Sequence, residues 1–325
     1  MRILFAGSPA IAVPSLEMLC SRLCQKEGVE LSGVLTNPDS PKGRHGAPLP
    51  TEVGQAAERI LLQFKEQGRP LFPVLKPLKI DAFFREQIGA LKIDLLVSFA
   101  FGRFFGPKFM ALFPYSGINI HPSLLPKYRG PTPVQSAILN RDSVTGITIQ
   151  YLAQEMDGGD ILAAEHLQLT GKETTGMLSE TIAGKAALML PAVLNKIKTG
   201  GQGKAQDHSK ASYCSLISRD DGLIDWKESA VKIEAKIRAF DPWPLCRTIH
   251  NGRELFILKA DVFKDEQRAE SRQGLVLGID KKDGILVQTG EGILAVTELQ
   301  YSAKKALFWR DFLNGTRDFP GSILG

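Results

Sequence analysis

The chain has 325 residues, more than one hydrophobic core usually fills, so we expect two domains. Its composition, with 43% hydrophobic and 23% charged residues, is that of an ordinary globular protein and excludes a disordered or fibrous chain. The net charge of +5, with a pI near 8.9, permits a polyanionic partner without requiring one.

The N-terminal segment has the pattern of a β-turn-α-β unit. Residues 2–5 are a short apolar run, a Gly7-Ser-Pro9 turn follows, residues 15–25 have helical periodicity, and residues 30–35 are predicted as a second strand. Such a unit favours a parallel sheet with right-handed crossovers. The turn lacks the G-x-G-x-x-G pattern, so a dinucleotide site is not supported.

Targeting and redox signals point to a cytoplasmic protein. Gly7 and two prolines interrupt the apolar N-terminal run, which is therefore interpreted as a strand and its turn instead of a signal peptide. No apolar run reaches the roughly 18 residues that a membrane span needs. The cysteines contain no C-x-x-C pair, which is typical of reduced thiols; they are Cys20, Cys24, Cys214 and Cys246.

Helices and strands then alternate as far as residue 198. Residues 36–50 are a long Pro- and Gly-rich loop, which in a compact domain is usually functional or disordered. Helices are predicted at 51–67, 80–91, 133–140 and 174–198, and extended segments at 71–74, 94–99, 117–121, 145–152 and 161–169. The run Thr199-Gly-Gly-Gln-Gly-Lys204 is the natural boundary, which divides the chain into domains 1–203 and 204–325.

The second domain has a different pattern, dominated by short strands. Helices are predicted at 229–239 and 304–313, and strands at 245–250, 254–262, 274–279, 284–288 and 293–299. Five short strands joined by turns favour a small OB-like β-barrel. Residues 205–325 carry 18 Lys and Arg against 18 Asp and Glu, so this domain is not basic overall.

Three polar residues form the candidate catalytic group. Asn119 and His121 lie two residues apart on a predicted strand, so both side chains point to one face. They lie at the carboxyl end of that strand, where open α/β sheets place their ligands. Asp157 follows in a Gly-rich turn, where its carboxylate can orient the imidazole or cap the turn. An amide, an imidazole and a carboxylate suit acyl transfer to an amine without a covalent intermediate.

Basic and aromatic residues near these elements have two possible roles each. Lys127 and Arg129 either belong to an ordinary loop or contact anionic groups of a substrate. For Lys42 and Arg44 in the long loop, plain surface charge is the simpler interpretation from the residues alone. Trp243, in the turn Phe240-Asp-Pro-Trp-Pro244, is expected to cover the core of the second domain.

These motifs give the chain a family resemblance. The element Asn119-Ile-His121-Pro-Ser-Leu-Leu-Pro126 with the downstream Asp157-Gly-Gly-Asp160 resembles the folate-dependent formyltransferase family. Three further segments resemble its methionyl-tRNA branch and extend the resemblance over essentially the whole chain; they are Arg2-Ile-Leu-Phe-Ala-Gly-Ser-Pro9, Asn37-Pro-Asp-Ser-Pro-Lys-Gly-Arg44, and Ile224-Asp-Trp226 with Ile237-Arg-Ala-Phe-Asp-Pro-Trp-Pro244.

The resemblance implies a Rossmann-like N-terminal domain with a parallel-rich sheet and an OB-like C-terminal domain that binds tRNA. It implies formyl transfer from 10-formyltetrahydrofolate to the α-amino group of methionine on initiator tRNA, without a metal. By position, the catalytic residues are Asn119, His121 and Asp157. The folate-contacting residues are Ser123, Leu124, Leu125 and Pro126, with Ala100, Phe101 and Gly102 at the pterin. The tRNA-contacting residues, at the acceptor stem, are Lys42, Arg44 and Arg129.

Other interpretations remain open from the sequence. A formyltransferase with a small amine acceptor, such as a nucleotide sugar or glycinamide ribonucleotide, shares the trio but needs no second domain of this kind. A non-enzymatic RNA-binding protein with an inert first domain is a third possibility. The intact trio argues against it, because such a protein would tolerate loss of these residues. We expect a monomer, and residues 59–79, which are longer than usual for the family, have no assigned function.

Overall fold

The computed structural model describes residues 1–41, 46–264 and 272–325, which form two compact units. Unit 1 comprises Met1–Pro133, Thr145–Leu167 and Ser179–Cys214, and unit 2 comprises Val134–Val144, Gln168–Leu178 and Ser215–Gly325. Residues 204–214 thus pack with unit 1, and the division after residue 203 stays a prediction of the sequence.

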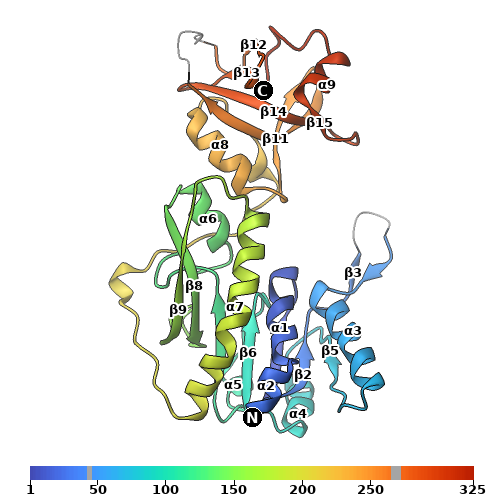
Figure 1. The fold of residues 1–325 in the computed structure, drawn as a ribbon, viewed down its shortest axis with the longest axis vertical. Helices are drawn as coiled ribbons and strands as arrows, with labels where there is room; N and C mark the ends of the chain where they lie inside the picture. Colours follow the sequence, from blue (N-terminus) through green and yellow to red (C-terminus); the bar gives the residue numbers. More distant parts are fainter. Residues whose placement is uncertain (42–45, 265–271) are drawn as a thin grey trace. The chain divides into compact units, whose positions relative to one another are not determined.

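A seven-stranded sheet forms the centre of unit 1, in the order β5-β2-β1-β6-β7-β8-β9 (Figure 1). Its strands are β1 (Arg2–Gly7), β2 (Glu30–Leu35), β5 (Val74–Leu75), β6 (Leu95–Phe99), β7 (Gly117–His121), β8 (Val144–Tyr151) and β9 (Ile161–Gln168). The five strands from β5 to β7 are parallel, and β8 is antiparallel to β7. The predicted parallel-rich α/β sheet is therefore confirmed.

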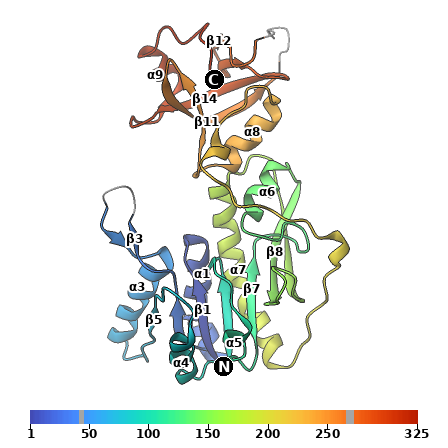
Figure 2. The ribbon, with the colours of Figure 1, turned by 180° about the vertical axis from the view of Figure 1, so that it is seen from behind.

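Helices cover both faces of this sheet (Figures 1 and 2). They are α1 (Val13–Leu19), α2 (Arg22–Lys26), α3 (Glu52–Glu66), α4 (Ala82–Ala90), α5 (Pro107–Met110) and α7 (Thr175–Lys198), with a short 3₁₀ turn, η1 (Ala10–Ala12). The predicted helix at 15–25 is two helices, because Ser21 starts a new one by accepting a hydrogen bond from the Cys24 amide. The long loop contains a small hairpin of β3 (Ser40–Pro41) and β4 (Pro48–Leu49).

A row of phenylalanines packs beneath the strand that precedes the candidate site. The rings of Phe101, Phe105 and Phe109 stack in sequence, with centroids 5.3 and 5.4 Å apart, and Phe113 closes the row edge-on. All four are buried in one cluster with apolar residues of α4, β1 and β6. This packing fixes the chain that leaves β6 beside the end of β7.

Helix α7 is long and apolar enough, by length and composition, to cross a membrane. Its buried residues recur every three or four positions, as Ile182, Ala186, Leu190, Val193 and Ile197. A core helix of a folded domain has this pattern, so we interpret its apolar character as packing.

Unit 2 contains an antiparallel sheet in the order β10-β11-β14-β13-β12, with β15 paired to β14. Its elements are α6 (Pro133–Leu139) at its border, η3 (Asp220–Gly222), α8 (Ala230–Ala239), β10 (Cys246–His250), β11 (Arg253–Phe263), β12 (Val276–Asp280), β13 (Gly284–Gln288), β14 (Ile293–Tyr301), β15 (Leu307–Phe308) and α9 (Trp309–Asn314). The 3₁₀ turn η2 (His208–Lys210) belongs to unit 1. The five predicted strands are confirmed, and OB-like closure stays a prediction. The last helix begins five residues later than expected, because Lys304 lies in a turn and β15 precedes the helix.

The tryptophan expectation is wrong. Trp243 is 55% exposed, whereas Trp226 and Trp309 are buried. The Trp226 indole donates to Thr248 Oγ1 at 3.0 Å, which satisfies its polar group inside the core.

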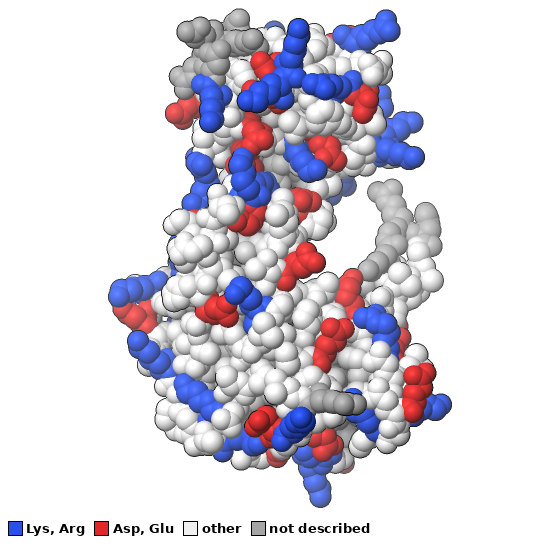
Figure 3. All heavy atoms as spheres, in the orientation of Figure 1, with Lys and Arg blue, Asp and Glu red and all other residues white. Residues whose placement is uncertain are grey.

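On the face drawn in Figure 3, acidic and basic side chains are interspersed over each unit.

Two glycines provide a test of the packing in unit 1. A Cβ at Gly146 in β8 would lie 2.2 Å from the Glu165 carbonyl oxygen, whereas a Cβ at Gly184 in α7 meets nothing within 4 Å. We expect Gly146→Ala to lower the free energy of unfolding by about 1–3 kcal/mol, because a backbone group cannot yield cheaply. Gly184→Ala should raise it by about 0.5–1 kcal/mol through helix propensity. Urea unfolding of both variants measures this; equal midpoints would contradict the packing.

Candidate active site

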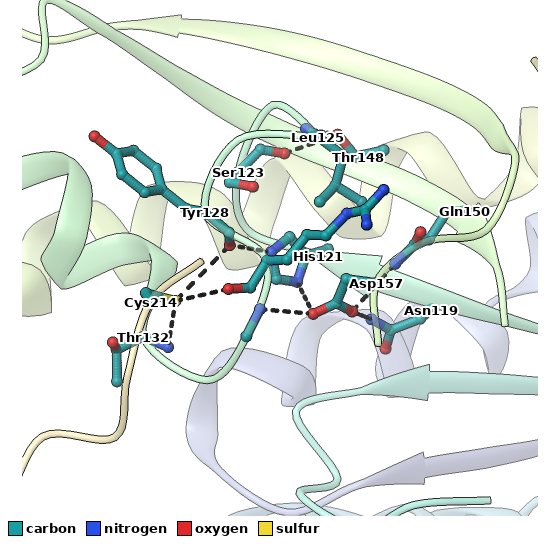
Figure 4. Close-up of polar contacts among 12 residues, drawn as sticks. Asn119, His121, Ser123, Leu125, Tyr128, Thr132, Thr148, Gln150, Asp157 and Cys214 are labelled. Carbon is teal, nitrogen blue, oxygen red and sulfur yellow. Dashed lines mark hydrogen bonds and ion pairs between the residues drawn. The ribbon is translucent and has the colours of Figure 1, made fainter. Parts of the chain in front are cut away.

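The site is built at the end of β7, beside the ends of the parallel strands (Figure 4). Ser98 pairs with Asn119 and Phe99 with Ile120, so the chain leaving β6 emerges next to His121. On the other side, Asn119 pairs with Gln150 of β8. The strand geometry thus directs Asn119 and His121 to one face, as expected from their spacing.

Asp157 meets both side chains from the loop between β8 and β9. Its Oδ1 accepts from Asn119 Nδ2 at 3.3 Å and from Gln150 Nε2 at 3.1 Å, and its Oδ2 accepts from the Gly130 amide at 2.9 Å. The same Oδ2 lies 3.6 Å from His121 Nδ1. The residue has a left-handed backbone, φ 53°, which Asp tolerates better than most residues. The structure therefore brings the three predicted residues together.

A hydrogen bond at Nε2 fixes the tautomer of His121. Its Nε2 lies 2.8 Å from the Tyr128 carbonyl oxygen, which can only accept, so Nε2 carries a hydrogen. In the neutral ring, the lone pair is then on Nδ1, the nitrogen that faces Asp157. The imidazole is 3% exposed, and Asn119 and Asp157 are partly exposed.

Burial lowers the pKa of His121 below its ordinary value. The Asp157 carboxylate and the Tyr128 carbonyl oppose this shift, and the Arg129 guanidinium adds to it. The ring is therefore a neutral base at neutral pH, with an acidic neighbour placed to stabilise its protonated form. The side-chain amide of Asn119 donates to Oδ1 of the same Asp157 carboxylate.

The turn that follows β7 is fixed by its own polar groups. Ser123 Oγ donates to the Lys127 carbonyl oxygen at 2.5 Å, and Thr148 Oγ1 donates to the Ser123 carbonyl oxygen at 2.7 Å. Thr148 Oγ1 also accepts from the Leu125 amide at 3.1 Å. The Ser123 and Leu125 side chains are buried by these contacts, whereas Leu124 and Pro126 are partly exposed.

The segment of residues 100–102 presents backbone at the site. Ala100 and Gly102 are exposed and have positive φ values, whereas the Phe101 ring is buried in the phenylalanine row. Asn37 Nδ2 donates to the Phe101 carbonyl oxygen at 3.1 Å. Within the described residues, the buried Asn37 Oδ1 has no hydrogen-bond partner.

The structure corrects the expectation for Arg129. Its side chain is 0% exposed, so it offers no surface to an RNA phosphate. Its guanidinium nitrogens contact Glu155 at 2.6 Å, Gln206 at 2.8 Å, and Tyr213 and His208 at 3.2 Å. Arg129 therefore binds other parts of unit 1. Lys42 and Arg44 lie outside the described residues.

Two site residues were not found from the sequence. Gln150 is buried on β8 and donates to Asp157; a glutamine on a strand that alternates toward the core was an available signal. Gln206 is buried in the segment after the Gly-rich run, and no sequence pattern marked it. Among residues 1–41, 46–264 and 272–325, no group of three or more His, Cys, Asp or Glu side chains is placed to hold a metal ion.

Comparison with known proteins identifies both parts of the chain. Residues 1–194 match the family described as formyl transferase, and residues 216–317 match the family described as formyl transferase, C-terminal domain.

Relatives match over the full length. A methionyl-tRNA formyltransferase of Treponema denticola is 48% identical over 327 residues, covering 98% of both chains. One of Treponema pallidum is 44% identical over 97% of both chains. The solved structure of HypX from Aquifex aeolicus in complex with tetrahydrofolic acid has a TM-score of 0.60 at 16% identity. It covers 96% of this chain, which spans only 47% of that one, and shows a shared fold.

The contacts of His121 lead to a pKa prediction. Replacing Asp157 by Asn keeps a side chain that tolerates the left-handed backbone but removes the charge that raises the His121 pKa. We expect the His121 pKa to fall further, as measured by NMR titration of the imidazole. Asp160→Asn, a nearby exposed position, is the control; a His121 pKa that stays constant or rises in Asp157→Asn would show that the carboxylate does not act on this ring.

Proposed function

The chain belongs to the formyl transferase family, and we propose that it transfers the formyl group of 10-formyltetrahydrofolate to the α-amino group of methionine on initiator methionyl-tRNA. The observation that carries this proposal is the 48% identity to a methionyl-tRNA formyltransferase over 98% of both chains. The polar trio at the end of β7 supplies the chemistry that such a transfer requires.

Asn119 supplies the electrostatic part of the reaction. The neutral amine attacks the formyl carbon, and the carbonyl oxygen becomes a tetrahedral oxyanion. A side-chain amide has two N–H groups, and one of those of Asn119 donates to Asp157. The other can donate to the oxyanion, a contact that stabilises such intermediates by roughly 3 kcal/mol.

His121 and Asp157 supply the proton transfer. Nδ1 of the neutral ring takes the proton that the attacking amine loses, directly or through water. The resulting imidazolium then has N–H groups toward Asp157 Oδ2 and the Tyr128 carbonyl, both already in place. The formyl group needs no protein nucleophile, because the amine itself attacks. When the tetrahedral intermediate collapses, the bond between the formyl carbon and N10 of the folate breaks, and the imidazolium returns its proton to N10, so that tetrahydrofolate leaves and His121 is neutral again.

The folate substrate fits the segments that border the trio. We place the pterin against residues 100–102, where the exposed Ala100 and Gly102 offer backbone polar groups to ring nitrogens. Leu124 and Pro126, the partly exposed residues of the stiff turn, provide apolar contact on the other side. We assign to the buried residues Ser123, Leu125 and Phe101 the support of these segments.

The tRNA substrate is assigned from sequence and family. Its acceptor stem meets the 36–50 loop, with Lys42 and Arg44 at phosphates. Residues 205–325 have equal numbers of acidic and basic residues, 18 of each, so local contacts and not overall charge hold the tRNA on that part of the chain. We further propose that the protein acts as a monomer in the cytoplasm.

We expect Asn119→Ala to lower kcat by about 10²–10³-fold through loss of the oxyanion donor, and His121→Ala to lower it by about 10²–10⁴-fold through loss of the base. Single-turnover formylation of methionyl-tRNA, followed on acid-urea gels, measures both. Asn140→Ala is the matched control, since Asn140 is exposed and its amide donates to the Ser136 carbonyl of α6. Near-normal turnover in both active-site variants would remove them from the chemistry.

For the loop we expect Arg44→Ala to raise the KM for tRNA and to reduce the salt dependence of tRNA binding by about one charge, with folate binding unchanged. Filter binding at several salt concentrations, beside folate calorimetry, measures this. Equal losses of affinity for tRNA and folate would show that the loop has a different role.

A further inference from the structure

We propose that Gln206 is a positioning residue of this active site, which acts through Asp157. Its side-chain amide contacts both the turn that carries Asp157 and the loop that carries Arg129, and these two segments place the Asp157 carboxylate beside His121. This inference rests on the proposed formyl transfer and assigns a role to the segment of residues 204–214, which follows the Gly-rich run and packs with unit 1.

Gln206 has an unusually full set of partners for a side chain in a connecting segment. The two N–H groups of its Nε2 are shared among three acceptors, the backbone carbonyls of Asp157 at 2.8 Å and Gly159 at 2.7 Å and Gln150 Oε1 at 3.0 Å. Its Oε1 accepts from Arg129 at 2.8 Å. The side chain is 6% exposed, so these contacts are made away from water.

The nitrogen of Gln206 fixes the turn that carries the carboxylate. Asp157 has a left-handed backbone, which a non-glycine residue keeps only when surrounding contacts impose it. Gln206 holds the carbonyls on both sides of this turn. Gly159 is pressed so closely on Tyr151 that a Cβ would lie 1.9 Å from its carbonyl oxygen, which prevents the turn from shifting in that direction.

The oxygen of Gln206 links the Asp157 turn to the second loop through Arg129. That loop supplies the Tyr128 carbonyl, which accepts from His121 Nε2, and the Gly130 amide, which donates to Asp157 Oδ2. The partners of the imidazole and of the carboxylate therefore come from two loops, and Gln206 contacts both. Loss of its amide would release the backbone of the Asp157 turn, so that the carboxylate, still bonded to other groups, would move away from Nδ1.

The His121 pKa reports a displacement of the Asp157 carboxylate, because this charge acts on the ring. Asp157 raises the His121 pKa, and Arg129 lowers it. Arg129 keeps Glu155, Tyr213 and His208 as partners when Gln206 is replaced, so it stays in place. A shifted Asp157 turn therefore lowers the His121 pKa, whereas a general loss of stability only reduces the fraction of folded protein.

The test compares Gln206→Met, which keeps the length of the side chain without its donors, with Gln202→Met in the same full-length protein. Gln202 is the matched control, because it is exposed and its amide donates to the nearby Gly200 carbonyl. For Gln206→Met we expect kcat for formylation of methionyl-tRNA to fall by about 10–100-fold, with KM for both substrates unchanged. The acid limb of the pH profile of kcat/KM moves to lower pH, and NMR titration of His121 in the substrate-free protein shows the same direction. Gln202→Met leaves kcat, both KM values, the pH profile and the His121 pKa at the wild-type values.

A wild-type kcat, or a lowered kcat with unchanged pH profile and His121 pKa, overturns the positioning role. If Gln206→Met does not fold, Gln206→Asn, which keeps an amide one methylene shorter, is judged by the same criteria. A wild-type protein that fails to formylate methionyl-tRNA refutes the proposed function, and the His121 titration of the variants still decides whether Gln206 positions Asp157.

Discussion

The carboxylate of Asp157 is the contact on which the site depends. It accepts hydrogen bonds from Asn119, Gln150 and the Gly130 amide, which come from three different segments, and it faces the His121 ring. Such donors replace the water contacts that a partly buried carboxylate loses. The same donors aim it, so charge stabilisation and geometry come from one set of contacts.

Desolvation gives the imidazole its chemical role. A buried His121 is neutral because burial lowers its pKa, and the Tyr128 carbonyl decides which nitrogen keeps the hydrogen. The free lone pair therefore faces the acid that will stabilise the protonated ring. A more exposed histidine would be charged in part of the molecules at neutral pH, and it would have no fixed tautomer.

The sequence predicted the elements with strong periodicity and the meeting of Asn119, His121 and Asp157, but not the residues that connect them. Strand β7 and the amphipathic helix α3 were placed within one residue, because their patterns are local. The break at Ser21 escaped detection, since a cap competes with an unbroken helical period. Arg129 was expected to reach RNA, because nothing local shows that residues almost 80 positions later bury it. Gln206 was missed for the same reason.

The central claim is that this site transfers a formyl group to methionine on tRNA, and an acceptor competition tests it most directly. Wild-type protein is given 10-formyltetrahydrofolate together with charged initiator methionyl-tRNA, glycinamide ribonucleotide and an amino-sugar nucleotide, and each product is quantified. The account predicts that formyl-methionyl-tRNA is formed and that the two small amines stay unmodified. Formylation of a small amine, with methionyl-tRNA left unchanged, would contradict it.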